Sequence, residues 1–230
     1  MSLKQHHEEE GEKHWQVSYI DLLTALLATF VLLLALSVPD QGKLDNFVSS
    51  MAQNKKQQSL KSLSNELANV ISSTPQLKGQ IRVVMTENGI ELRFGSSLLF
   101  SPGEATLKPQ GYEAIYRIGQ ILSYFVKARD AYLAIEGHTD DTNLRSKEKF
   151  LSNWELSSVR ATEVLHYLQD TVMIDGYRLS TTGFSSSRPS NKKVDSLKTV
   201  DSDEARIALE EARNDNRRVV VRIYYYKPTA

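Results

Sequence analysis

The chain has 230 residues, and its 28 lysine and arginine residues balance its 28 aspartate and glutamate residues. This zero formal net charge gives no general electrostatic reason to expect nucleic acid as a partner. The chain has no cysteine, which excludes disulfide bonds, thiolate metal sites and cysteine nucleophiles. A hydrophobic content of 40% is ordinary for a soluble domain, so a single long apolar run stands out.

That apolar run extends from Val17 to Val38, and its 22 residues predict a transmembrane helix about 33 Å long. Asp21 is its only charged residue. A carboxylate in a membrane-spanning helix costs up to about 3 kcal/mol on insertion scales, so its presence indicates a function. Small or polar residues share the helix face of Asp21, namely Ser18, Thr24, Ala25, Ala28 and Ala35. Such a face favours close contact with other helices.

Two other interpretations of the apolar run stay open. It resembles a cleaved signal peptide near Ala35, although the tail before it is acidic where signal peptides are basic. Alternatively, Asp21 caps the start of the helix. The orientation is also open, because two lysines precede the run and four follow it shortly. Lysine counts alone predict a cytoplasmic C-terminal side, but a large downstream domain crosses the membrane largely regardless of such charges.

The segment from Pro39 to about Gln80 is mostly polar and is predicted to connect two parts of the chain. A short amphipathic helix is expected near its start, where four apolar residues share one side: Leu44, Phe47, Val48 and Met51. Such a helix suits a membrane surface or a partner protein. An ordinary surface helix is an equally good interpretation.

The rest of the chain carries the pattern of an α/β domain. Alternating residues from Ile81 to Arg93 predict a β-hairpin. Helices are predicted from Pro109 onward and from Trp154 to Gln169, the second capped by Asn153. The remaining predicted elements are strands at 131–135, 178–182 and 218–226 and a short helix at 203–213. This order predicts an α/β sandwich, in which helices pack on one face of a mixed sheet.

Four motifs in this domain carry a family resemblance: IEGHTDDT, SNWELSSVRA, TTGFSSSRP and NRRVVVRI. In content and order they resemble the OmpA-type peptidoglycan-binding domain. The membrane segment independently resembles that of ion-motor stator subunits of the MotB and PomB type, in which an aromatic residue, an aspartate and a leucine-rich run follow a short tail. The resemblance implies four regions: a cytoplasmic tail at 1–16, a transmembrane helix at 17–38, a plug and linker at 39–80, and an OmpA-like domain at 81–230.

The resemblance also implies a binding site for the diaminopimelate-containing peptide of peptidoglycan. Arg160 is expected to bind the carboxylate of that ligand, because a guanidinium fork matches a carboxylate, and Asp140 is expected to bind its ammonium. The implied pocket also includes Thr139, Asn153, Leu156 and Arg217. The loop at 141–151 is longer than in the compact family pattern, so the pocket wall is not predicted. A mere internal salt bridge between Arg160 and Asp140 is the main alternative.

A metal site and acid–base catalysis find less support in these residues. A metal site would have to use His138, Asp140, Asp141 and His166, whose spacing matches no recognised ligand pattern. An acid–base pair of Glu136 and Asp140 would lack a nucleophile. We therefore expect no enzyme, no metal site and no cofactor.

The resemblance implies a peptidoglycan-anchoring stator subunit of an ion-driven rotary motor in the bacterial inner membrane. Two copies would sit within a ring of five copies of a MotA-like multi-span protein, with the N-terminus in the cytoplasm and the C-terminal domain in the periplasm. Asp21 would carry the translocated H⁺ or Na⁺ beside Ser18 and Thr24, and the amphipathic helix would plug the unassembled channel. A flagellar motor is the default. The alternatives are a ZorB-like subunit of the Zorya phage-defence system and a passive OmpA-like envelope tether without ion conduction.

Overall fold

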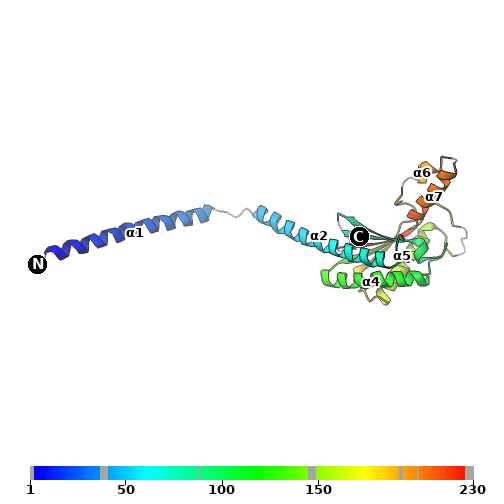
Figure 1. Ribbon diagram of the computed structural model, residues 1–230, viewed down its shortest axis with the longest axis horizontal. Coiled ribbons are helices and arrows are strands. Elements are labelled where there is room, and N and C mark those ends of the chain that lie inside the picture. Colours follow the sequence, from blue (N-terminus) through cyan, green and yellow to red (C-terminus); the bar gives the residue numbers. More distant parts are fainter. Residues whose placement is uncertain are drawn as a thin grey trace. The chain divides into compact units, whose positions relative to one another are not determined.

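A computed structural model describes residues 3–36, 41–87, 89–144, 149–191, 194–200 and 202–225. The chain divides into two compact units, Met1–Lys56 and Gln57–Ala230. Figure 1 shows the long N-terminal helices, one of which crosses this division, and the mixed fold of the second unit. The division falls within the segment that the sequence predicts to be a linker.

The first unit contains helix α1, which spans Leu3–Leu36. Its stretch from Trp15 to Ala35 has a mean hydropathy of 2.2 and is long enough to cross a membrane. Asp21 lies well inside α1, and its backbone carbonyl accepts a hydrogen bond from Thr24 Oγ1 at 3.0 Å. The helix-capping interpretation of Asp21 is therefore wrong, because a capping residue precedes the first helical turn.

Helix α2 spans Gln41–Ser73 and is continuous where the sequence suggested a polar linker. Its C-terminal half carries four buried residues at helical spacing, Leu60, Leu63, Leu67 and Ile71, which join the core of the second unit. Burial of this stripe makes the helix stable although its composition is polar.

The N-terminal half of α2 carries the predicted plug residues. Phe47, Val48 and Met51 are all exposed, whereas the side chain of Leu44 lies outside the described residues. Three large apolar side chains in solvent on one helix suit a contact with another protein or a membrane.

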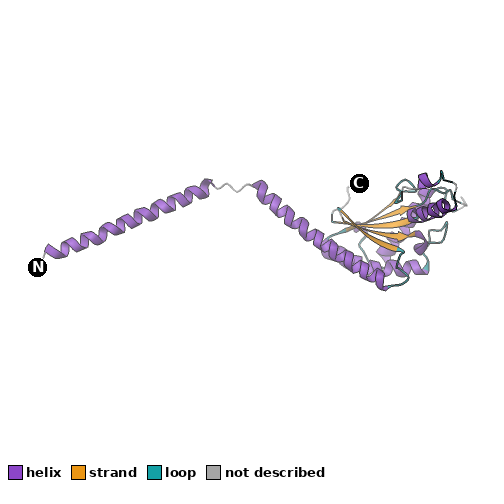
Figure 2. Ribbon diagram, turned by 45° about the horizontal axis from the view of Figure 1, so that its top comes forward, coloured by secondary structure: helices purple, strands orange, loops and turns teal. Residues whose placement is uncertain are grey.

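The second unit is built on a five-stranded mixed sheet (Figure 2). Its strands are β1 Ile81–Thr86, β2 Gly89–Gly95, β3 Tyr132–His138, β4 Leu179–Gly183 and β5 Arg218–Tyr224. The order is β1-β2-β5-β3-β4, so the last strand of the chain lies in the middle of the sheet. Only β3 and β4 run parallel. The predicted hairpin and the predicted mixed sheet are confirmed.

Helices α4, at Pro109–Arg129, and α5, at Asn153–Asp170, cover one face of this sheet. The shorter helices are α3 Ser96–Leu99, a 3₁₀ turn at Gly176–Arg178, α6 Val194–Leu197 and α7 Asp203–Asn216. Side chains from α2, α4, α5 and the strands form one apolar core on that face. The predicted α/β fold class, with helices on one face, is confirmed.

The start of α5 differs from the prediction by one residue. Ser152 is the capping residue, and its hydroxyl accepts the backbone N–H of Glu155 at 3.3 Å. The Glu155 carboxylate in turn accepts the backbone N–H of Leu151 at 2.7 Å. Asn153 is the first helical residue rather than the cap, because the Ser152 hydroxyl satisfies a free N–H group of the first turn while Glu155 reaches back to the residue before the cap, a variant of the reciprocal Ser-x-x-Glu motif.

The opposite face of the sheet is polar. Arg222 bridges the buried carboxylates of Glu91 and Glu136 at 2.5 and 2.8 Å. His138 lies 3.5 Å from Glu136. Burial lowers the pKa of His138 and outweighs the opposing attraction of the Glu136 carboxylate, so this imidazole is neutral at pH 7.

Candidate functional site

The six residues predicted to bind peptidoglycan line a single cavity of about 790 Å³. Thr139 and Asp140 follow the end of β3, and Arg160 lies two turns into α5. The other three come from α5 and from the residue before β5, and are Asn153, Leu156 and Arg217. The structure therefore brings together every residue that the motifs single out for this site.

Two glycines allow α5 to approach the sheet closely enough to form this cavity. A Cβ atom on Gly137 of β3 would lie 1.9 Å from the carbonyl oxygen of Ser157, and one on Gly183 of β4 would lie 2.1 Å from the Ser158 hydroxyl. Any side chain at these positions would push α5 away, because such distances are far below van der Waals contact. The glycines thus set the separation between Arg160 on α5 and Asp140 after β3.

Asp140 is held firmly at the edge of the cavity, where only 4% of its surface is exposed. Its Oδ1 accepts hydrogen bonds from the backbone N–H of Thr142 at 3.0 Å and from the Thr142 hydroxyl at 2.5 Å. Its Oδ2 pairs with the guanidinium of Arg217. The ion-pair partner of Asp140 is therefore Arg217, and the alternative of an Arg160–Asp140 salt bridge is wrong for the described residues.

Arg160 is equally fixed, and 5% of its surface is exposed. Its Nε donates to the carbonyl of Glu104 at 2.8 Å and its Nη2 donates to that of Ser101 at 3.4 Å. The guanidinium also lies over the ring of Phe100, 5.0 Å from its centroid. Burial lowers the pKa of Arg160 to about 10, against the attraction of Asp140, so the group is charged at neutral pH. The two bonds engage two of its five N–H groups, and the others are available to an anion in the cavity.

The remaining wall of the cavity mixes apolar and polar groups. Leu156 is buried, and the side-chain amide of Asn153 donates to the carbonyl of Thr142 at 2.7 Å. The buried hydroxyl of Thr139 has no hydrogen-bond partner among the described residues. Burial favours the neutral form of Arg217, but hydrogen bonds to Glu210 and Asp140 outweigh it and raise the pKa of Arg217. A fixed cation, a fixed anion and a free hydroxyl thus face one cavity.

Sequence reasoning missed the segment that supports Arg160. The stretch from Phe100 to Glu104 belongs to none of the four motifs, yet it supplies two carbonyls and an aromatic ring. The contact joins positions 56 residues apart, so no local pattern signals it. Residues 145–148 of the long loop, including Arg145, Lys147 and Glu148, lie outside the described residues.

The alternative chemistries find no matching geometry in the described part of the chain. No three histidine, cysteine, aspartate or glutamate side chains lie together there in a way that could hold a metal ion. His166 is exposed on α5, away from His138 in the sheet. Glu136 pairs with Arg222 on the polar face of the sheet, whereas Asp140 lines the cavity, so the two do not act as an acid–base pair.

Two family models match the chain, and they cover both of its units. The model described as "Membrane MotB of proton-channel complex MotA/MotB" matches residues 2–55, and the model of the OmpA family matches residues 99–201. The chain is 27% identical to Motility protein B of Bacillus subtilis, over 96% of this chain and 94% of that protein. The chain belongs to the MotB-type stator proteins with an OmpA-like domain.

Solved structures of the MotB type agree with this assignment. A putative MotB-like protein from Desulfovibrio vulgaris superposes with a TM-score of 0.62 at 26% identity, over 77% of this chain and 98% of that one. The periplasmic domain of Helicobacter pylori MotB gives a TM-score of 0.50 at 26% identity, over 63% and 81% of the two chains. As a MotB-type protein the chain is a stator component and not an enzyme.

Proposed function

We propose that this MotB-type protein anchors an ion-driven rotary motor of the flagellar type to the cell wall, and that Asp21 carries the translocated ion. The observation that carries the proposal is that the anion of Asp140 and the cation of Arg160 are fixed in one cavity. A second observation supports the motor. One carboxylate, Asp21, lies in the only apolar helix of membrane-spanning length in the described chain.

The cavity suits a zwitterionic ligand such as the diaminopimelate end of a peptidoglycan peptide. The free N–H groups of Arg160 would bind the carboxylate as a bidentate pair, which is the strongest form of this contact. The ammonium would bind beside Asp140, and the unpartnered Thr139 hydroxyl would donate to a further oxygen. Arg217 already pairs with Asp140, so it would keep that carboxylate aligned when the ligand is absent.

The membrane part of the proposal follows from the cost of a charge in lipid. A carboxylate in an apolar helix is stable when it faces protein or is neutralised. Binding of H⁺ or Na⁺ to Asp21 would neutralise it, and release would restore the charge, which changes the contact of the helix with a partner wall. Ser18 and Thr24 share its face and would line the ion path. Because the wall site must face the peptidoglycan, the proposed orientation has the C-terminal domain in the periplasm.

The partner in this proposal is a MotA-like multi-span protein in five copies that surrounds a dimer of this chain. The exposed side chains of Phe47, Val48 and Met51, together with Leu44, would form the plug before assembly. An amphipathic helix that covers a channel mouth must be displaced when the wall site engages. This order of events would keep unanchored complexes from leaking ions.

A complementation assay tests the proposal. Cells that lack the native gene would carry the wild-type chain, Asp21→Asn or Asp21→Glu, and motor output would be measured as rotation or swimming speed. We expect Asp21→Asn to abolish output and Asp21→Glu to retain part of it, with membrane level and partner copurification unchanged in both. Full output from Asp21→Asn would contradict the ion-carrying role. If the wild-type chain binds the cell wall but neither copurifies with a partner nor gives motor output, a passive tether is favoured instead.

A further inference from the structure

A second cavity of about 460 Å³ lies beside the first and is rich in arginine. Four arginines and one acid, Asp215, are its charged lining residues among the described ones: Arg82, Arg93, Arg217 and Arg218. The two cavities share four lining residues, Ser96, Ser97, Asn214 and Arg217. A ligand that leaves the first cavity on this side would therefore enter a strongly basic environment.

Three of the four arginines have carboxylate partners, in the pairs Arg82–Asp215, Arg93–Glu91 and Arg217–Asp140. Arg218 has none within ion-pair distance in the described chain. Its Nη1 and Nη2 donate to the backbone carbonyls of Asn216 at 3.2 Å and Arg188 at 2.9 Å. Carbonyls orient a guanidinium but do not balance its charge, so Arg218 is the one arginine of this cavity without a carboxylate in ion-pair contact among the described residues.

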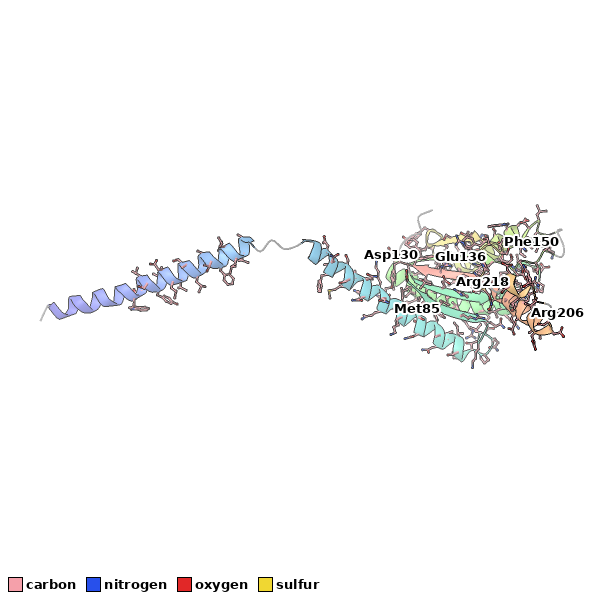
Figure 3. The ribbon with its side chains drawn as sticks, turned by 90° about the horizontal axis from the view of Figure 1, so that it is seen from above. Met85, Asp130, Glu136, Phe150, Arg206 and Arg218 are labelled. Atoms are coloured by element: carbon pink, nitrogen blue, oxygen red, sulfur yellow. The ribbon has the colours of Figure 1, made fainter. Side chains whose placement is uncertain are left out.

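The surroundings of Arg218 make its unpaired charge costly. Its Nε is buried and has no hydrogen-bond partner among the residues that the structure describes. Burial, together with the like charge of Arg93, lowers the pKa of Arg218 to about 10, although Glu136 and Glu91 act in the opposite direction. A side chain that is charged, partly buried and unpaired is stabilised by an anion that enters the cavity. Figure 3 shows Arg218 and Glu136, which both belong to strands of the five-stranded sheet.

The neutral lining groups favour an oxyanion. The Ser190 hydroxyl accepts a hydrogen bond from Arg93 at 3.1 Å, so its own proton can be donated to a ligand. The Ser97 hydroxyl donates to Gln80 across a long 3.4 Å contact that a stronger acceptor would replace. Guanidinium groups match the planar or tetrahedral oxygens of carboxylate and phosphate better than a lone halide does.

We propose that this cavity is a second subsite that binds an oxyanion, a carboxylate or a phosphate, carried by the same cell-wall polymer whose peptide occupies the first cavity. The proposal rests on the proposed function for the identity of the polymer. The four shared lining residues give the reason to assign both cavities to one polymer. The subsite would add affinity that depends on salt, because its main contribution is electrostatic.

Titration of the full chain in detergent with inorganic phosphate, followed by calorimetry, tests the subsite without reference to the wall. We expect Arg218→Gln to weaken phosphate binding at least about tenfold, the effect of losing one charged hydrogen-bond donor group. Arg206→Gln is the matched control, since it also removes one positive charge, lies on α7 away from both cavities and has a side chain 76% exposed (Figure 3). Binding within twofold of wild type is expected for it.

A second variant protects the test against misfolding of Arg218→Gln. Arg82 also lines the cavity but has a side chain 61% exposed, so Arg82→Gln should leave the fold intact. It is expected to weaken phosphate binding about two- to fivefold. No phosphate binding by the wild type, or equal affinities of the Arg82→Gln, Arg218→Gln and Arg206→Gln chains, would overturn the proposal.

Cosedimentation of the full chain with purified cell walls identifies the source of the oxyanion. Walls would be used before and after chemical removal of their phosphodiester polymers. Weaker binding of Arg218→Gln to both preparations indicates a peptide carboxylate, and weaker binding to untreated walls alone indicates a phosphate. If Arg218→Gln binds both like Arg206→Gln, the wall subsite is wrong. The proposed function is tested separately in the same assay. If Arg160→Lys binds cell walls as well as the wild-type chain does, the proposed function fails.

Discussion

Replacing Arg160 by lysine tests whether a guanidinium fork, rather than a positive charge alone, recognises the ligand. The wild-type side chain uses Nε and Nη2 to hold the carbonyls of Glu104 and Ser101 and keeps its other N–H groups for the cavity. Lysine preserves the charge but cannot hold both carbonyls and also present two parallel donors. Each charge-assisted hydrogen bond contributes about 1.5 to 3 kcal/mol. The loss of one predicts an affinity about 10- to 100-fold lower.

Calorimetric titration of the full chain in detergent with a soluble diaminopimelate-containing muropeptide measures this loss. The matched control is Arg206→Lys, an exposed position on α7 that is not part of the cavity lining. Thermal unfolding of each variant is needed beside the titration, because Arg160 also supports the loop around Ser101. We expect the free energy of unfolding of Arg160→Lys to fall by about 1 to 2 kcal/mol, because hydrogen bonds to the loop are lost. An Arg160→Lys chain that is folded and binds the muropeptide as tightly as the control would refute the assigned role.

Two further predictions concern stability. Burial alone would raise the pKa of Asp141, but hydrogen bonds from Arg213 and Lys198 outweigh it and lower that pKa from 3.8 to about 2. Because the folded-state pKa lies below the unfolded one, the stabilisation is complete above about pH 4 and is lost as the pH falls towards 2. Asp141→Asn should lower the free energy of unfolding by about 1 kcal/mol at pH 7, after allowance for solvent screening, and by almost nothing at pH 2. Urea unfolding measures this difference, and an equal loss at both pH values would contradict the prediction. Leu67→Ala should destabilise the second unit by about 2 to 5 kcal/mol, because Leu67 of α2 is fully buried. Glu66 is exposed, so Glu66→Ala should change the stability of this unit by less than about 0.5 kcal/mol. Equal melting of these two variants would show that α2 does not pack as described.

The parts of the fold with local sequence signals could be predicted. Alternation around the tight turn predicts the β1–β2 hairpin, and Pro109 with its apolar periodicity predicts the start of α4. The motifs also predict which residues line the cavity, because each one lies at the end or the start of a strand or at the start of a helix. The central place of β5 carries no local signal, since strand order is decided by packing between distant segments.

Two misread segments show why local signals fall short. In α2 the apolar stripe of Leu60, Leu63 and Leu67 is set among glutamine, lysine and serine, so average composition suggests a linker. The helical spacing of that stripe was the available signal. At the start of α5, Ser152 and Asn153 are both good capping residues. Glu155 decides between them, because it stands three positions after serine as the reciprocal motif requires.

The pairing within the site lay beyond any sequence argument. The motifs place Asp140 and Arg160 at one cavity, but the ion partner of Asp140 is Arg217, 77 positions later in the chain. Arg160 instead donates a hydrogen bond to the backbone of the loop before α4. The separation between Arg160 and Asp140 depends on the distance between α5 and β3, which the close approach of Gly137 to Ser157 sets. A pattern predicts the residues of a site more readily than their partners, because the partners depend on tertiary packing.

Ion flux through a complex of this chain with a MotA-like protein, reconstituted in liposomes, tests whether Asp21 carries the translocated ion. The plug would first be disabled by replacing Phe47, Val48 and Met51 with serine, so that conduction does not require wall binding. A pH-sensitive or Na⁺-sensitive dye inside the liposomes would report the flux under an imposed membrane potential. We expect flux when Asp21 is present and its loss in Asp21→Asn, with the complex still assembled. Equal flux with and without the Asp21 carboxylate would contradict it.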